Sequence, residues 1–185
     1  MTRPKAPGEL ELVQDFINTL DCETGKDELA PPGALSAWLA EHGIGHSRGK
    51  AAPGDLDRAK ALREALRDLA ESNAEHTPPN PKAIKTLRDS MLHAGVRAEL
   101  DDQARPTFVA TTPGIPGALG YLMGIVLRAM NDGTWARFKV CPRETCRFAF
   151  YDQSKNKSGT WCSMAVCGNR EKAKEFRLRH AHASS

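Results

Sequence analysis

The spacing of apolar residues over positions 1–134 predicts a mainly helical segment. Apolar side chains recur every three or four positions, which is the interval that lines one face of an α-helix. The pattern predicts five helices that begin near residues 10, 35, 55, 84 and 116. In the third predicted helix, this spacing places Arg63 and Arg67 on the solvent side. The last begins at Pro116 and is the expected central buried helix.

Two short β-prone runs interrupt this helical pattern. Residues 96–100 and 107–111 are separated by a polar turn that begins Asp101-Asp102-Gln103. Two such runs joined by a short polar turn are typical of a β-hairpin. We therefore expect an α+β fold in which the mainly helical N-terminal domain, residues 1–134, carries one small hairpin.

The pattern changes where the second expected domain, residues 135–185, begins. Residues 135–140 form a predicted strand, and residues 147–151 alternate as the partner strand should. A polar turn over residues 152–159 follows, and Ser163 is a good N-cap for a helix that runs to about residue 181. The predicted order is a hairpin followed by a helix.

Four of the five cysteines lie in this second segment, spaced C-x4-C, fifteen residues, C-x4-C: Cys141, Cys146, Cys162 and Cys167. Two pairs of thiolates form a closed tetrahedral shell for one zinc ion per chain, with no position left for a substrate. With one pair in a turn and one at the helix start, the geometry is that of a treble-clef-like zinc finger. The alternative is a disulfide framework, which belongs to secreted proteins.

Charge divides the chain at the same place. Residues 135–185 carry eleven Lys and Arg against four Asp and Glu, whereas residues 1–134 carry fifteen against nineteen. A basic module on an acidic body favours a polyanionic partner, although the charge could serve solubility alone. No apolar run approaches the roughly 18 residues of a membrane span, and the N-terminus lacks a signal-peptide pattern. We expect a cytoplasmic protein with reduced thiols and no membrane partner.

Three short runs resemble the CGNR zinc finger family of bacterial proteins: Phe150-Tyr151-Asp152-x-Ser154, Trp161-Cys162-Ser163-Met164 and Cys167-Gly168-Asn169-Arg170. Residues 15–19, Asp-Phe-Ile-Asn-Thr, resemble the opening of the ABATE domain that precedes this finger. Members of that family are regarded as stress-related transcription regulators, and the resemblance implies the same function here. It also implies that the four cysteines named above are the metal ligands.

Residues beside the four cysteines are candidates to hold these metal ligands in position. Gly168 lets the backbone pass close to the cluster, where a side chain would crowd the thiolates. Asn169 can donate its amide to a sulfur or cap a carbonyl, and Arg170 can bind Asp152 and so tie the helix to the hairpin. We expect Asp152, Asn169 and Arg170 to support the metal site, and Phe150 and Trp161 to form the small core of the finger.

The sequence of the last predicted helix indicates how the finger could bind DNA. At 3.6 residues per turn, a face that includes Phe176 and His180 should dock on the hairpin, which leaves Glu171 and Glu175 outermost. Those carboxylates do not suit a helix that reads bases in the major groove. We therefore expect the basic flanks to bind phosphates, through Arg170, Lys172, Lys174, Arg177 and Arg179.

Two classes of function stay open. In the first, the protein is a DNA-binding transcription regulator whose helical body forms a homodimer or senses a small-molecule effector. In the second, the finger is a zinc-stabilised protein-interaction module and the body binds the small molecule. The sequence contains no phosphate-binding glycine loop, nucleophile elbow or His-Glu-x-x-His motif, and we expect no enzymatic activity.

Overall fold

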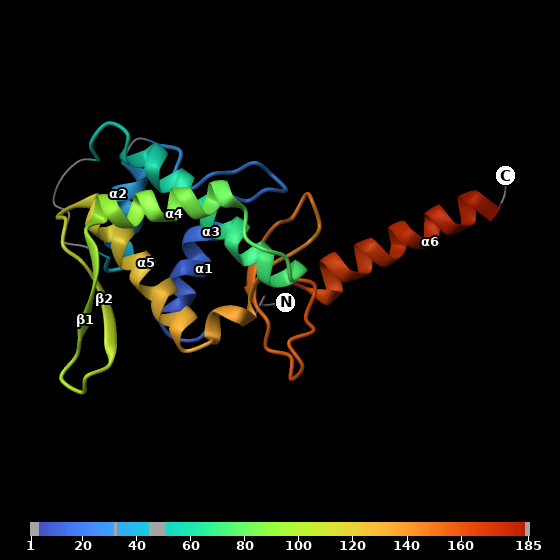
Figure 1. The fold of residues 1–185 in the computed structure, drawn as a ribbon. Coiled ribbons are helices and arrows are strands. Elements are labelled where there is room, and N and C mark those ends of the chain that lie inside the picture. Colours follow the sequence, from blue (N-terminus) through green and yellow to red (C-terminus); the bar gives the residue numbers. More distant parts are fainter. Residues whose placement is uncertain (1–3, 32, 45–50, 184–185) are drawn as a thin grey trace.

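The computed structural model describes residues 4–31, 33–44 and 51–183. Figure 1 shows a helical body from which a hairpin and a long C-terminal helix extend. The elements of the body are α1 (Leu10–Asn18), α2 (Ala34–Glu41), α3 (Asp55–Glu75), α4 (Pro81–Ala94), β1 (Val96–Leu100), β2 (Pro106–Ala110) and α5 (Ile115–Asn131). This order confirms the predicted α+β fold with a mainly helical N-terminal part. No helix among the described residues has the length and apolar character needed to cross a membrane.

The central position of α5 is also confirmed. Leu122 and Val126 are fully buried, and α5 packs against α1, α3 and α4. Strands β1 and β2 pair antiparallel with Val96 opposite Ala110 and pack against the same helix. Where α4 and β2 meet α5, a Cβ on Gly120 would lie 2.5 Å from the Cβ of Ala94 and 2.7 Å from that of Ala110. Only glycine therefore allows the hairpin and α4 to approach α5 this closely.

Arg63 and Arg67 on α3 do not face solvent, and the prediction for them was wrong. Their exposed fractions are 3% and 0%. Arg63 forms a double hydrogen-bonded ion pair with Asp27, at 2.7 and 3.1 Å. Arg67 donates to the backbone carbonyl oxygens of Ile17 in α1 and of Arg147, both far away in the sequence. Helical spacing shows only the neighbours along one helix, so it cannot show that distant partners allow these charges to be buried.

The C-terminal segment contains η1, a 3-10 helix (Thr134–Arg137), then β3 (Phe138–Val140), β4 (Ala149–Tyr151), η2, a π-helical turn (Met164–Gly168), and α6 (Asn169–Ala183). The first strand begins three residues later than predicted. Side chains three residues apart eclipse each other in a 3-10 helix. Trp135 accordingly stacks on Phe138, with ring centroids 4.8 Å apart. The predicted hairpin is present, with Phe138 opposite Tyr151 and Val140 opposite Ala149.

The β3–β4 hairpin has two buried faces. Phe138, Val140 and Ala149 belong to the same apolar core as the helices of the body, whereas Phe150 packs against the four cysteines. Polar side chains of the body fasten the hairpin as well. Asn73 on α3 donates to the carbonyl oxygens of Trp135 and Phe138, both at 2.9 Å. The core of the body therefore includes residues from the C-terminal segment.

Helix α6 extends away from the body (Figure 1). The predicted docking of its face on the hairpin was wrong, since Phe176 on that face is 56% exposed, as much as Leu178, which is 53% exposed. Both faces of the hairpin are already covered, one by the body and one by the cysteine cluster. In addition, residues two positions apart point to different sides of a helix, so Phe176 and Leu178 do not form one apolar stripe.

Candidate metal centre

The four cysteines are placed by the turns that the sequence predicted. Cys141 directly follows β3, and its N–H donates to the carbonyl oxygen of Phe148 at 3.0 Å. A tight turn brings Cys146 back, with its N–H 2.8 Å from the carbonyl oxygen of Arg143. Cys167 lies in the π-helical turn, where its N–H donates to the carbonyl oxygen of Ser163 at 2.9 Å. Two chelating turns thus converge from the hairpin and from the start of the last helix.

The sulfur atoms form a compact cluster. All four lie within 4.8 Å of one another. The Sγ atom of Cys162 is 3.6 Å from that of Cys146 and 3.7 Å from that of Cys167. Four sulfurs at about 2.3 Å from a central zinc ion form a tetrahedron with edges of about 3.8 Å. The separations match this edge and exceed a disulfide bond of about 2.05 Å. All the cysteines are free thiols, so the disulfide alternative does not describe this structure.

The electrostatics of the cluster also favour a bound cation. Hydrogen bonds from Cys146 and Cys162 lower the pKa of Cys141 to about 4. Hydrogen bonding to Cys141 and Cys146, together with burial, raises the pKa of Cys162. One thiolate therefore forms easily and suppresses ionisation of its neighbour. A divalent ion that bonds to all four sulfurs removes this conflict, because its charge stabilises every thiolate at once.

The site is closed. The exposed fractions of the four cysteines lie between 0% and 6%, and Phe148, Phe150 and Trp161 pack around them. A four-thiolate site without an open position serves structure and not catalysis. Phe150 is 1% exposed, so the expectation that it belongs to the core of the finger is confirmed.

Asp152 supports the site through a partner that the sequence analysis missed. Its side chain accepts hydrogen bonds from Lys139 at 2.8 Å and from the N–H groups of Ser154 and Gly159 at 2.9 and 2.8 Å. Burial would raise the pKa of Asp152, but the hydrogen bonds from Lys139, Ser154 and Gly159 together outweigh it and lower that pKa well below 3.8. Asp152 thus fixes the turn that leads into Cys162. The predicted ion pair between Asp152 and Arg170 was wrong.

Arg170 instead reaches the helical body. Its Nη1 atom lies 2.7 Å from Oε1 of Glu23, in the loop between α1 and α2. The same carboxylate accepts hydrogen bonds from Arg143, at 3.1 and 3.4 Å, and Arg143 lies 4.0 Å from the Sγ atom of Cys167. Arg170 is thus a link between the finger and the body.

The two other signature residues maintain the turn before α6. Asn169 donates its amide to the carbonyl oxygen of Ala165 at 3.2 Å, which is the capping role considered above. A Cβ on Gly168 would lie 2.4 Å from Sδ of Met164 and 3.1 Å from Cδ1 of Trp161. The crowding that requires glycine therefore comes from these side chains and not from the thiolates.

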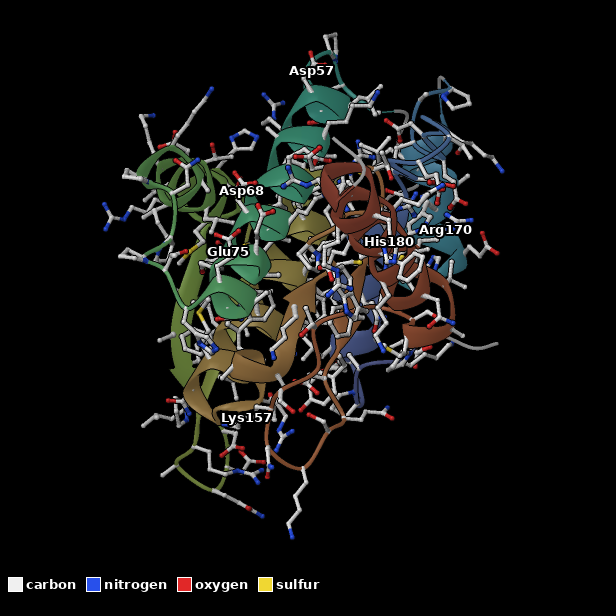
Figure 2. The ribbon with its side chains drawn as sticks, turned by 90° about the vertical axis from the view of Figure 1, so that its right-hand side faces the viewer. Asp57, Asp68, Glu75, Lys157, Arg170 and His180 are labelled. Atoms are coloured by element: carbon white, nitrogen blue, oxygen red, sulfur yellow. The ribbon has the colours of Figure 1, made fainter. Side chains whose placement is uncertain are left out.

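The predicted nucleic-acid-binding residues all lie on α6. Figure 2 views the molecule from the side toward which this helix extends and labels Arg170 and His180 on it. Lys172, Lys174, Arg177 and Arg179 are exposed, and Lys174 lies 3.9 Å from Glu171. Beside the start of α6, a cleft of about 350 Å³ is lined by residues that include Arg143, Trp161 and Lys174.

Sequence reasoning missed Lys139, Arg143 and Glu23 as parts of the site. Lys139 alternates with Phe138 and Val140, and this alternation alone places it on the face opposite the body core. The chain gave no comparable signal for Glu23, which lies 120 residues from Arg143 in sequence.

Comparison with known proteins gives the family. A model described as "Putative stress-induced transcription regulator", ABATE, matches residues 10–132. A second model, the CGNR zinc finger, matches residues 137–180 and so includes the four cysteines, which are suited to bind one zinc ion. No curated protein is significantly similar to the chain. Since the first match alone covers more than half of the residues, the chain belongs to the ABATE family and carries a CGNR zinc finger.

Proposed function

We propose that the protein is a DNA-binding transcription regulator whose finger and α6 hold the phosphate backbone of a duplex. Membership in a family of transcription regulators supports the general role. The observation that carries DNA binding is α6 itself, an exposed helix that extends from the metal centre with five cations against two carboxylates. Such a protein acts in the bacterial cytoplasm, where the chromosome lies.

The arrangement of charges on α6 suits phosphate binding better than base reading. Glu171 and Glu175 interrupt the cations along the helix. Carboxylates in the major groove are accepted well only by the amino group of cytosine. Cations on the flanks reach phosphates whatever the base sequence, and they release counterions when they bind. Sequence selection would then depend on other parts of the protein or on the shape of the duplex.

The salt dependence of binding tests this proposal. For the full-length, zinc-loaded protein and a short random duplex, log affinity should fall against log salt with a slope of roughly −3 to −4.5, as three to five engaged cations predict. Replacing Arg177 with Gln should flatten the slope by about one unit. The control is Arg88→Gln on the exposed side of α4, which should leave the slope unchanged. Binding that does not depend on salt, or equal effects of the two variants, contradicts the proposal.

A second candidate function is a zinc-stabilised protein-interaction module. Exposed apolar side chains on the finger favour it: Met164 at 49%, Val166 at 37%, Phe176 at 56% and Leu178 at 53%. Replacement of Phe176 and Leu178 by Ser would then abolish partner binding without changing the salt slope on DNA. The small-molecule effector, the homodimer and the absence of enzymatic activity stay predictions.

A further inference from the structure

The carboxylate of Glu23 lies between two guanidinium groups of the finger. It accepts two hydrogen bonds from Arg143, in the turn between the first two cysteines, and one from Arg170, at the start of α6. We propose that Arg143 and Arg170 form a phosphate-binding site for nucleic acid, and that Glu23 occupies this site in the free protein as an internal competitor. This inference rests on the proposed DNA-binding function.

The chemistry of the site fits a phosphodiester as well as a carboxylate. A guanidinium group presents parallel N–H donors that match two oxygens sharing one negative charge. Glu23 offers such a pair of oxygens, and each non-bridging oxygen pair of a nucleic-acid backbone offers another. Arg143 is well placed for this role, because its contact with Cys167 fixes it relative to the metal centre and only 15% of its side chain is exposed.

The body holds Glu23 in place. The side chain of Asp21 accepts hydrogen bonds from the N–H groups of Glu23 and Thr24, at 2.8 and 3.3 Å. A few residues further on, Asp27 forms the buried ion pair with Arg63 of α3. The loop is therefore anchored on both sides of Glu23. Since the competitor is part of the same chain, its effective concentration at the site is high.

The contact is also open to exchange. The side chains of Glu23 and Arg170 are 40% and 52% exposed, so a phosphate can replace the carboxylate at the surface without unfolding of the finger. If the contact of Glu23 with Arg143 and Arg170 had only a structural role, a different result would be expected. Its removal would loosen the finger and leave DNA affinity unchanged or weaker, whereas removal of a competitor strengthens DNA binding.

The test compares Glu23→Gln with Glu28→Gln, in the full-length, zinc-loaded protein on a short random duplex. Glu28 is an exposed residue of the same loop, so its replacement removes the same charge and serves as the matched control. We expect Glu23→Gln to bind about 10-fold more tightly than the wild type. Its salt slope should become steeper by about one to two units, because Arg143 and Arg170 then neutralise further phosphates. In an Arg143→Gln/Arg170→Gln background, which lacks both partners of Glu23, the gain from Glu23→Gln should fall to that of the control.

The possible outcomes separate this inference from the proposed function. If the wild type binds with the expected salt slope but the Glu23 and Glu28 variants behave alike, the competitor role is wrong and the DNA-binding proposal stands. A gain that persists in the Arg143→Gln/Arg170→Gln background also overturns the inference, because Glu23 then acts only through long-range charge. If neither the wild type nor the variants bind duplex DNA, the proposed function fails and the inference fails with it. Zinc content and melting temperature, measured for each variant, identify any loss of the fold.

Discussion

The guanidinium of Arg67 donates a 2.5 Å hydrogen bond to the backbone carbonyl oxygen of Arg147, which joins the middle of α3 to the turn that contains Cys146. Arg67 also donates to the carbonyl oxygen of Ile17, at 2.7 Å, and its side chain is 1% exposed. Arg147 in turn pairs with Asp68 and Glu71 of the same helix. The metal-binding turn and the helical body are thus held together by reciprocal contacts.

We expect Arg67→Met to destabilise the protein by about 3 kcal/mol, because buried carbonyl oxygens lose their donor. Urea unfolding followed by circular dichroism measures the free energy of unfolding. The control is Arg58→Met, where a side chain 44% exposed pairs with Asp55 and should contribute less than about 1 kcal/mol. Similar losses in the two variants would show that the contact between Arg67 and Arg147 is unimportant.

The purified protein should contain one zinc ion per chain, and Cys162→Ser should lose it. Zinc binding in small finger domains contributes roughly 10 to 16 kcal/mol of apparent free energy. Because Phe138, Val140 and Ala149 belong to the body core, we expect the variant also to lower the melting temperature of the helices. Metal analysis and thermal circular dichroism measure the two effects.

Cys22→Ser is the control for this experiment, since Cys22 is outside the cluster. It should keep both the zinc and the melting temperature. If Cys162→Ser loses zinc but its helices melt as in the wild type, the body core does not depend on the finger.

The ion pair of Lys139 and Asp152 should determine how firmly the finger holds its metal. We expect Asp152→Asn to weaken zinc binding by about 10-fold, because the turn before Cys162 loses its anchor. Lys139→Met should have a similar effect, and the double variant should lose less than the sum of the two. Competition with a chelator measures the affinity. Arg170→Ala should stay near the wild type, and a strong loss of zinc there would contradict the assignment of Lys139 as the partner.

Acid should weaken the anchor of the loop that carries Glu23. Burial would raise the pKa of Asp27, but hydrogen bonds from Arg63 and from the N–H of Leu29 outweigh it and lower that pKa to about 2. A carboxyl group with a lowered pKa stabilises the fold above its ordinary value of 3.8, and this stabilisation is lost as the pH falls toward 2. The difference in unfolding free energy between the wild type and Asp27→Asn should therefore shrink from pH 4 to pH 2.

Asp89→Asn provides the comparison for this pH series. Asp89 pairs with Lys85 on the surface of α4, and its side chain is 58% exposed. The variant should follow the wild type across the whole range, since exposed pairs contribute little. A constant difference between the wild type and Asp27→Asn would mean that the ion pair with Arg63 does not titrate as described.

The sequence predicted the features that depend on residues close to one another along the chain. Periodic apolar residues located the helices, and the cysteine spacing located the metal ligands, because both signals lie within short stretches of chain. The partners of buried charges could not be predicted. Arg67 meets Arg147 across 80 positions, and Arg170 meets Glu23 across 147. Asp152 and Arg170 have complementary charges, but in the fold Asp152 pairs with Lys139 at 2.8 Å. The same ammonium group also donates to two backbone carbonyl oxygens, at 2.6 and 3.1 Å.

The shared core also decides the order in which the protein can be completed during synthesis. A ribosome makes the chain from its N-terminus, and domains generally fold as units as they emerge. Here Trp135, Phe138 and Ala149 fill the core of the body, so this core can be completed only after the chain has been made as far as Ala149. The core of the helical body therefore cannot be completed before Cys141 and Cys146, the first two cysteines of the metal centre, have been translated.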